Sequence, residues 1–393
     1  MRYNDGDQAP RKEFLIDMEN TPPPWVDDAF IATVAKIDRL SQRRGPHFLH
    51  ASLQGRYRPE PAHWWTAGFW PGLLWLTYSE TKSPHLRALA ESLEEQLDQA
   101  LLAFTELHHD VGFMWTLTSV ARYQRLGEAS SLRRGIMAAT LLAGRFNPAG
   151  GFIRAWGTLK EEGQDRAGWS IIDTMMNLSL LFWAFRQTAD PRFYHVAVRH
   201  ADTVLREFIR QDGACHHIVS FDPATGQRIE ALAGQGYAAD SAWSRGAAWA
   251  LYGMTNTYRH TQDQQYFEAA ARVAGLFWRE LARDPIPFWD FRLPTRENMP
   301  RDTSAACIAA SALIDLARLA PLPAGQTYHQ LALRILHAIY TEATTFDEDE
   351  DGIVLHGTGH FPHHQNVDVP LIYGDYFFME ALAKLRGQSP SRW

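Results

Sequence analysis

Two aspartates occupy positions at which acid–base chemistry could be carried out. Asp110 opens an apolar helical segment directly after His108 and His109, and Asp173 lies in the first turns of a segment, residues 168–185, that is apolar almost all round. Burying a lone carboxylate is costly unless it is paired or hydrogen-bonded, and burial raises its pKa as a general acid requires. Helix capping would also explain either aspartate. We expect Asp173 to be catalytic, whereas the surroundings of Asp110 fit a cap and a site equally well.

Arg245 and Trp249 are four residues apart and therefore share one face of a predicted helix. The arginine could bind a carboxylate while the ring stacks on a sugar, and a cation–π pair in the core would use the same two residues. The chain has 14 Trp, 13 Tyr and 21 Phe, which suits a large core as well as a sugar-binding cleft. Together these residues suggest an enzyme that acts on acidic sugars, although ordinary two-carboxylate glycosidases would carry the same residues.

Helical periodicity runs along nearly the whole chain, with apolar residues at i, i+3, i+4 and i+7, whereas strand-like alternation is scarce. Asp190 followed by Pro191 is typical of a helix start. Long, turn-rich connections at 147–169, 211–239 and 285–302 are typical of functional loops. The predicted helices cover residues 25–43, 68–81, 85–107, 111–127, 130–146, 170–187, 191–210, 240–260, 264–283, 303–320, 326–342 and 375–385.

The number and pairing of these helices predict an all-α fold. About a dozen helices in antiparallel pairs fit an (α/α)6 barrel, which is a toroid of six helical hairpins. An α-solenoid is the alternative, but the sequence has no repeat of fixed period. No linker-like run of Pro, Ser or Gly divides the chain, so we expect an N-terminal extension at 1–24 and a single catalytic domain at 25–393.

Composition narrows the classes of protein and partner. The 393 residues are 46% hydrophobic, and the net charge of -7 argues against a nucleic-acid partner. Cys215 and Cys307 give no disulfide framework. No apolar run is long enough to span a membrane, and the polar N-terminus has no apolar signal core, so we expect no membrane association and a cytoplasmic location. The sequence leaves open whether the protein is a monomer or a homodimer.

Eight motifs extend the argument beyond single residues. They resemble, in the same order along the chain, motifs of the unsaturated glucuronyl hydrolases, glycoside hydrolase family 88. The resemblance implies an (α/α)6 barrel that uses no metal or organic cofactor. The motifs are HWWTAGFWPGLLWLTY at 63–78, HHDVGFMW at 108–115, IRAWG at 153–157, IIDTMMNLSLLFWA at 171–184, QGYAADSAWSRGAAWALYG at 235–253, IPFWDF at 286–291, DTSAACIAASAL at 302–313 and YGDYFFMEAL at 373–382.

The resemblance also implies a reaction and a set of site residues. Such enzymes hydrate the C4=C5 vinyl ether of a terminal unsaturated uronate, and the resulting hemiketal collapses with release of the sugar. Asp173 matches the general acid/base, and Asp110 matches a second aspartate that orients the substrate and influences the charge of Asp173. His217 is assigned by its spacing, with His216 as a possible substitute. The residues that match substrate-binding positions are Trp65, Trp156, His217, Gln235, Arg245 and Trp249.

One region departs from the family pattern. Gly359 stands where a tyrosine is expected, and His363 and His364 stand where Ser-Gly is common, so we do not expect a typical preference for sulfated chondroitin fragments. The histidines of this run, which include His356 and His360, could suggest a metal site. A polar loop at the rim of the pocket is the interpretation that we prefer.

Three other functions remain open at this point. An unsaturated rhamnogalacturonyl hydrolase would have the same fold and use the same hydration. An (α/α)6 sugar epimerase would need paired histidine bases in place of the two aspartates. A non-catalytic binder of acidic oligosaccharides would have no reason to bury Asp173.

Overall fold

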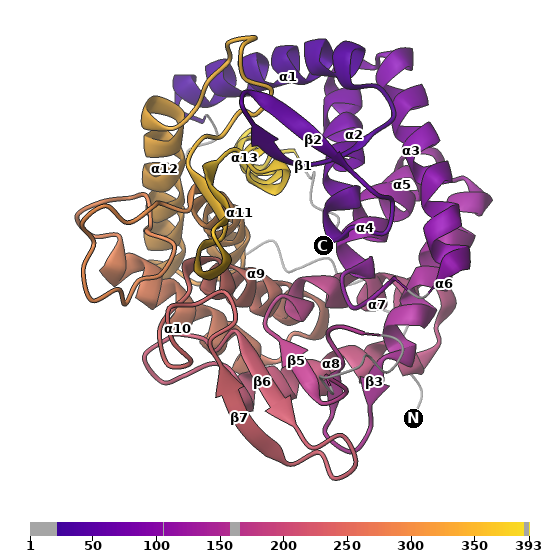
Figure 1. The fold of residues 1–393 in the computed structure, drawn as a ribbon, viewed down its shortest axis with the longest axis vertical. Helices are drawn as coiled ribbons and strands as arrows, with labels where there is room; N and C mark the ends of the chain where they lie inside the picture. The colour runs from indigo at the N-terminus through magenta and orange to yellow at the C-terminus, as the bar shows by residue number, and fades with distance from the viewer. Residues whose placement is uncertain (1–21, 105, 158–165, 389–392) are drawn as a thin grey trace.

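Helices form a closed double ring in the computed structural model, which describes residues 22–104, 106–157, 166–388 and 393 (Figure 1). The outer helices are α1 (Pro24–Arg44), α3 (Pro84–Ala103), α6 (Ala129–Gly144), α8 (Pro191–Glu207), α10 (Gln264–Glu280) and α12 (Ala324–Glu342). The inner helices are α2 (Phe69–Thr81), α4 (Val111–Trp115) continued by the π-helical turn η3 (Thr116–Val120) and α5 (Ala121–Leu126), α7 (Thr174–Thr188), α9 (Ser244–Thr261), α11 (Thr303–Leu319) and α13 (Ile372–Leu385).

Contacts between neighbouring helices close the inner ring. α2 packs on α13, α13 on α11, α11 on α9, α9 on α7 and α7 on α4, which contacts the turn that precedes α2. Inner helices are buried on nearly all sides, as in α11, where all residues from Thr303 to Ala317 are buried. Outer helices such as α8 bury one side only. The predicted (α/α)6 barrel of six helical hairpins is therefore confirmed, and the solenoid alternative is wrong.

Connection lengths distinguish the two ends of the barrel. Four of the turns that lead from an inner to an outer helix have two residues each, the first in the left-handed region, as at 82–83, 127–128, 189–190 and 262–263. The predicted start of α8 is confirmed, because Asp190 accepts a hydrogen bond from the backbone N–H of Arg192 at 2.9 Å. The outer-to-inner connections are longer and contain every strand of the described residues. All inner helices therefore begin at the end of the barrel that carries the long loops.

Short antiparallel strands build these loops. Trp169–Ile171 was predicted to be partly helical, and this prediction is wrong: Ser170 pairs with Val219, so α7 starts only at Thr174. The strands are β1 (Phe48–Leu53) with β2 (Arg56–Glu60), β3 (Phe146–Asn147) with β4 (Phe152–Ile153), β5 (Trp169–Ile171) with β6 (Ile218–Phe221) and β7 (Arg228–Leu232), and β8 (Gly357–His360) with β9 (Gln365–Val369). Two of the three predicted loops, 147–169 and 211–239, thus lie in the connections that carry β3 to β7, whereas the third, 285–302, contains no strand.

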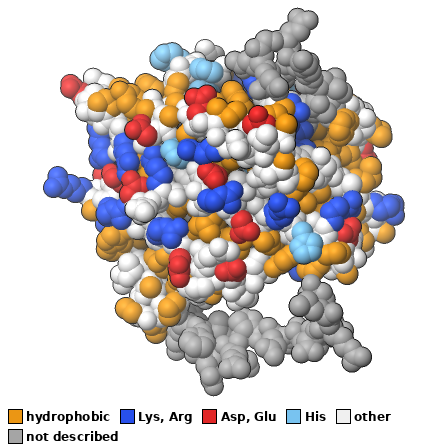
Figure 2. All heavy atoms as spheres, turned by 90° about the horizontal axis from the view of Figure 1, so that it is seen from below, with side chains coloured by type: hydrophobic (Ala, Val, Ile, Leu, Met, Phe, Trp, Pro, Cys, Tyr) orange, Lys and Arg blue, Asp and Glu red, His pale blue; other side chains and the backbone are white. Residues whose placement is uncertain are grey.

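The face of the molecule in Figure 2 mixes both signs of charge. Seen from below, acidic and basic side chains are interspersed rather than gathered into a continuous basic face (Figure 2). None of the described helices combines the length and apolar character that crossing a membrane requires. The interior of the ring is filled by aromatic side chains, which include Trp393 at 3% exposure.

Candidate active site

The predicted site residues meet where the inner helices begin. Asp110 directly precedes α4, Asp173 precedes α7, and Arg245 lies in the first turn of α9. Neither aspartate side chain caps its helix, since neither accepts a hydrogen bond from the first backbone N–H groups. This observation removes helix capping as the explanation for their positions.

Asn177 joins the two aspartates. Its Nδ2 lies 3.2 Å from Oδ1 of Asp110 and 3.3 Å from the backbone oxygen of Asp173. Its own Oδ1 accepts a hydrogen bond from the backbone N–H of Phe113 at 2.7 Å, which fixes the orientation of the amide. α4 can approach α7 this closely because of Gly112, where a Cβ would lie 2.4 Å from Oδ1 of Asn177.

Asp173 combines burial with an unused acceptor. Burial, and then the negative charge of Asp110, raise the pKa of Asp173 to about 7. Within the described residues its Oδ2 has no hydrogen-bond partner and lies 3.7 Å from Nε2 of His217, which has none either. A buried donor and acceptor that face each other without contact are expected where a substrate atom or a water molecule completes the arrangement.

The tautomer of His217 follows from its other nitrogen. Nδ1 accepts a hydrogen bond from the backbone N–H of Gln235 at 2.8 Å. Burial, and then the positive charge of Arg245, lower the pKa of His217 to about 3, so the ring is neutral at pH 7. The single ring proton is therefore on Nε2, and it points toward Asp173.

Arg245 is held from several sides. Its Nη1 donates to Oδ2 of Asp302 and its Nη2 donates to Oε1 of Gln235, both at 2.5 Å. The same two nitrogens donate to the backbone oxygens of Thr358 and Gly359, each at 2.5 Å. The guanidinium therefore ties the start of α9 to the start of α11 and to the β8–β9 hairpin.

The comparisons with known proteins agree on one family. The family model described as Glycosyl Hydrolase Family 88 matches residues 37–384. The chain belongs to this family. It is therefore a glycoside hydrolase, which rules out the epimerase and the non-catalytic binder.

Individual relatives and solved structures match this chain over nearly its whole length. This chain is 33% identical to the unsaturated chondroitin disaccharide hydrolase of Streptococcus agalactiae, over 95% of this chain and 97% of the relative. It is 32% identical to the unsaturated glucuronyl hydrolase of Bacillus sp. GL1, over 94% and 97%. The crystal structure of a Bacillus sp. GL1 unsaturated glucuronyl hydrolase superposes with a TM-score of 0.88 at 31% identity, covering 92% of this chain and 97% of that chain.

A further solved structure contains a sugar. It is an Asp-to-Asn variant of the unsaturated glucuronyl hydrolase from Streptococcus agalactiae, complexed with dGlcA-GalNAc6S. The TM-score is 0.81 at 26% identity, and the match covers 98% of this chain and 95% of that chain.

The three predicted tryptophans of the family 88 enzyme differ in exposure. The ring centroids of Trp65 and Phe113 are 5.7 Å apart. Trp156 and His109 form an edge-to-face pair whose ring centroids are 6.1 Å apart. Both are partly exposed, which leaves a face for a sugar. Trp249 is fully buried against Phe113 at 5.1 Å, so it lies beneath the site rather than in its wall. The cation–π partners of Arg245 are Trp243 and Tyr373, not the predicted Trp249.

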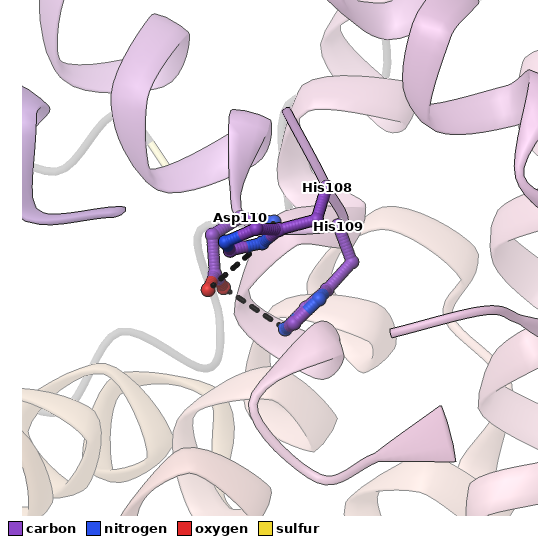
Figure 3. Close-up of side chains that lie close together, drawn as sticks. All are labelled: His108, His109 and Asp110. Atoms are coloured by element: carbon purple, nitrogen blue, oxygen red, sulfur yellow. Dashed lines mark hydrogen bonds and ion pairs between the residues drawn. The ribbon is translucent and has the colours of Figure 1, made fainter. Parts of the chain in front are cut away.

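A compact polar cluster surrounds Asp110 (Figure 3). The group is formed by His108, His109 and Asp110. Among the described residues, it is the only group of three or more His, Cys, Asp or Glu side chains whose potential metal-binding atoms all lie within 4.8 Å of one another. Nε2 of His109 is 3.1 Å from Oδ1 of Asp110, and Nδ1 of His108 is 3.5 Å from Oδ2. Nδ1 of His109 is committed to the backbone oxygen of Ala155 at 2.7 Å. We therefore interpret the group as a polar cluster around Asp110, in which Nε2 of His109 makes no hydrogen bond within the described residues.

The hairpin that departs from the family pattern is tightly packed. A Cβ at Gly359 would lie 3.0 Å from Cβ of Asn366, so a larger residue would require β9 to move. His360 stacks on His363 at 3.9 Å, while Nδ1 of His356 lies 2.6 Å from Asp368. These histidines contact different partners, as expected of a polar rim.

Sequence reasoning missed two roles at this site. Asn177 is not among the predicted site residues, although its place four residues after Asp173 in an apolar helix is the signal for a buried partner. Asp302, the first residue of the motif at 302–313, caps α11 by accepting a hydrogen bond from the backbone N–H of Ala305 at 3.4 Å. Its pairing with Arg245 depends on a contact across 57 positions, for which a single sequence gives no signal.

Proposed function

We propose that this family 88 enzyme removes a terminal 4,5-unsaturated uronic acid from short, lyase-generated oligosaccharides by hydrating the C4=C5 vinyl ether. Asp173 protonates C4, and the positive charge that develops at C5 is quenched by water. The same carboxylate takes a proton from that water and so regains its starting state. The hemiketal then opens to a 4-deoxy-5-keto uronic acid, and the remaining sugar leaves.

The gap between Asp173 and His217 is the observation that carries this proposal. Asp173, with a pKa of about 7, is partly protonated and partly ionised near neutral pH, as a group that acts first as acid and then as base requires. The Nε2–H of His217 faces Oδ2 across 3.7 Å. A water molecule beside this pair, bound to both in a bent bridge, would accept from His217 and donate to Asp173, as general-base activation for attack on C5 requires.

The remaining residues bind and orient the sugar. Asp110 accepts hydrogen bonds from substrate hydroxyls, while Trp65 and Trp156 offer ring faces to the pyranose. Trp249 supports this arrangement from below. Arg245 only donates, so Oε1 of Gln235 must face it, which directs the amide nitrogen of Gln235 away from the guanidinium.

The start of every inner helix at this end of the barrel favours an anionic substrate. Backbone N–H groups at a helix N-terminus carry a partial positive charge that stabilises a nearby carboxylate. The guanidinium of Arg245 is already paired with Asp302, so we propose that the helix N-termini assist Arg245 in binding the uronate carboxylate. The proposal includes a cytoplasmic location, with which the free, buried thiols of Cys215 and Cys307 are compatible.

Ultraviolet absorbance of the conjugated C4=C5 uronate provides the test. We would incubate the enzyme with unsaturated disaccharides prepared from chondroitin, hyaluronan, heparin, gellan and rhamnogalacturonan, each in sulfated and unsulfated form where both exist. We expect absorbance loss with at least one glucuronyl substrate, and faster turnover of unsulfated forms. Activity confined to rhamnogalacturonan fragments would instead support the rhamnogalacturonyl alternative.

A reaction in D2O separates hydration from direct attack at C1. Protonation of C4 by Asp173 delivers one deuterium to one face of C4, which NMR of the product detects. A product with no stereospecific deuterium at C4, or no absorbance loss by folded enzyme on any substrate, would contradict the proposal.

A further inference from the structure

The motif IPFWDF at 286–291 contains a buried aspartate that the proposed mechanism does not use. Asp290 is fully buried in the connection between α10 and α11. Its two carboxyl oxygens accept four hydrogen bonds, three from backbone N–H groups and one from a hydroxyl. The donors to Oδ1 are the N–H groups of Ala242 at 3.1 Å and Arg292 at 2.9 Å, and the donors to Oδ2 are the N–H of Tyr237 at 3.0 Å and Oγ of Ser241 at 2.6 Å.

Three of these donors lie in the segment 235–243, which leads into α9 and contacts the site at both of its ends. At the first end, the backbone N–H of Gln235 donates to Nδ1 of His217 at 2.8 Å. At the other end, the ring centroids of Trp243 and His217 are 4.4 Å apart. The guanidinium carbon of Arg245 lies 4.7 Å from the centroid of the same Trp243 ring. The course of this one segment therefore sets how His217 and Arg245 are placed.

Backbone contacts attach the end of the segment to the same motif. Asp290 and Trp243 form an isolated antiparallel bridge. The backbone oxygen of Trp289 accepts from both the backbone N–H and the hydroxyl of Ser244, each at 3.1 Å. Ser244 is the first residue of α9, so the motif fixes the point at which this helix begins.

We propose, building on the function proposed above, that Asp290 is a positioning residue that places His217 and Arg245 through residues 235–243. A buried side chain that satisfies four donors holds the backbone around it in one conformation. Loss of an acceptor would leave buried N–H groups unpaired, and the segment would have to rearrange to satisfy them.

Asp290→Asn tests this role with little change in size. Oδ1 faces two backbone N–H groups and Oδ2 faces one. In either orientation, the amide nitrogen of an asparagine would face at least one N–H group that can only donate. The variant therefore breaks the attachment of the segment whichever way its amide is turned.

Kinetics of the folded variant measure the effect on the site. We expect KM to rise and kcat to fall, so that kcat/KM for an unsaturated disaccharide drops by about 10²-fold, because small displacements of positioning groups are costly. Asp284→Asn is the matched control from the same connection. Like Asp290, Asp284 accepts from the backbone N–H two residues later, that of Ile286 at 3.1 Å, but its other partner is Arg301. The control should keep the wild-type kcat and KM.

NMR of 15N-labelled histidine tests the placement of His217 without any substrate. We expect wild-type His217 to show an unprotonated Nδ1 that accepts a hydrogen bond, and its signals are identified by their loss in His217→Gln. In Asp290→Asn the Nδ1 signal should shift as the hydrogen bond from Gln235 weakens, whereas Asp284→Asn should leave it unchanged. This readout stands whether or not the enzyme turns over unsaturated sugars, so it separates this proposal from the proposed function.

A purely structural role would give a different pattern. Asp290→Asn would then unfold at a lower urea concentration, while the folded enzyme kept the wild-type KM and His217 signals, and this result would overturn the proposal. Should Asp290→Asn not fold, Ser241→Ala decides, because it removes one of the four hydrogen bonds to Asp290. It should change KM and the His217 signal in the same direction by a smaller amount, and wild-type behaviour would again overturn the proposal.

Discussion

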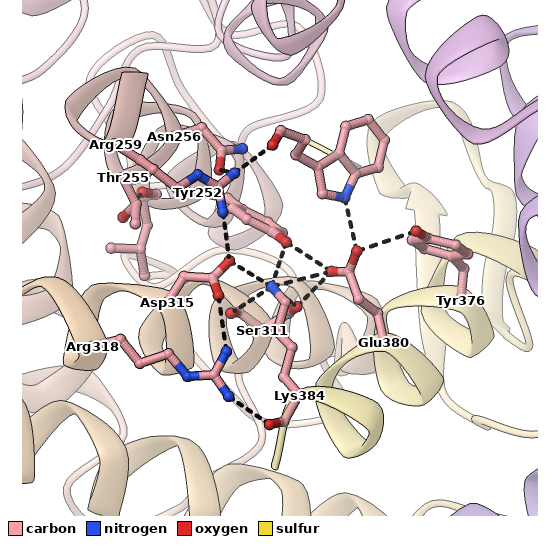
Figure 4. A network of polar contacts seen from close by, with 12 residues as sticks. Tyr252, Thr255, Asn256, Arg259, Ser311, Asp315, Arg318, Tyr376, Glu380 and Lys384 are labelled. Atoms are coloured by element: carbon pink, nitrogen blue, oxygen red, sulfur yellow. Dashed lines mark hydrogen bonds and ion pairs between the residues drawn. The ribbon is translucent and has the colours of Figure 1, made fainter. Parts of the chain in front are cut away.

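The barrel contains a buried polar cluster at each end, and the two differ in how their charged side chains are paired. At the end opposite the site, Glu380 and Lys384 of α13 meet Asp315 of α11 and Tyr252 of α9 (Figure 4). Oε1 of Glu380 accepts from Tyr376 and from Nε1 of Trp393, and its Oε2 accepts from Tyr252 and Ser311. Lys384 in turn donates to Tyr252, Ser311 and Asp315.

At the site end, two facing side chains of the predicted site each have a polar atom without a partner among the described residues. Oδ2 of Asp173 and Nε2 of His217 are buried and make no hydrogen bond in the part of the chain that the structure describes. A completed network fixes the helices relative to one another, whereas an incomplete one is stable only because the fold around it supplies the missing free energy. The difference indicates that the far end maintains the ring and that the site end is prepared for a ligand.

Asp173→Asn should have the largest effect of any single substitution on turnover. We expect kcat to fall by about 10³-fold or more, because the proton donor and acceptor is lost, while substrate binding measured by calorimetry is nearly unchanged. Thermal unfolding should show no loss of stability, since a costly buried carboxyl group has been removed. Retained turnover would exclude Asp173 from the chemistry.

Lys384→Met should show the reverse pattern. It leaves the buried carboxylates of Glu380 and Asp315 without their shared cation, which should lower the free energy of unfolding by about 3–5 kcal/mol. Urea denaturation measures this loss. The kcat/KM of the folded fraction should stay near the wild-type value, and a selective loss of kcat without loss of stability would show that the two ends are coupled.

Local signals in the sequence determined most of the helices. α8 and α10 begin at the predicted residues, Pro191 and Gln264, because capping aspartates precede both. The short strands could not be predicted in this way, since β5 forms only through its pairing with β6, about 50 residues later. The π-helical turn η3 inside the predicted helix 111–127 was also not anticipated.

The candidate site was predicted in part. Burial of Asp173 followed from the apolar segment around it, and residue type and spacing also singled out Asp110, Arg245 and Trp249. The family resemblance supplied the remaining positions, which are Trp65, Trp156, His217 and Gln235. The connections between them could not be predicted, because they join distant loops. Arg245 shows this limit: its hydrogen bond to Gly359 spans 114 positions, and its ring contacts are with Trp243 and Tyr373 instead of Trp249.

The two ends should respond to pH in opposite directions. Asp173 has a folded pKa of about 7, above its unfolded value of about 3.9, so the folded state holds its proton more tightly and stability falls as pH rises between these values. For Asp315, burial opposes ionisation, but Lys384 and then Arg259 lower the folded pKa. Asp315 therefore contributes stability above about pH 4, which is lost as pH falls through the folded pKa.

Urea unfolding from about pH 4 to pH 8 measures how the contributions of Asp173 and Asp315 to the free energy of unfolding change with pH. Relative to Asp173→Asn, the wild-type enzyme should lose up to about 4 kcal/mol as pH rises to 7. Relative to Asp315→Asn, its advantage should be constant from about pH 5 to pH 8 and shrink only below. The same slope for both variants would show that the two clusters do not differ in the way that their hydrogen bonds indicate.

Gly112→Ala should perturb the site end more mildly through packing. The new Cβ would lie 2.5 Å from Cα of Asn177 and 2.4 Å from its Oδ1, so α4 and α7 must separate. We expect a stability loss of about 1–3 kcal/mol and a lower kcat, because Asn177 joins Asp110 to Asp173. Gly144→Ala is the matched control: nothing lies within 4 Å of its added Cβ, so stability and kcat should be preserved. If both variants behaved alike, the close approach of α4 and α7 would not be what positions the two aspartates.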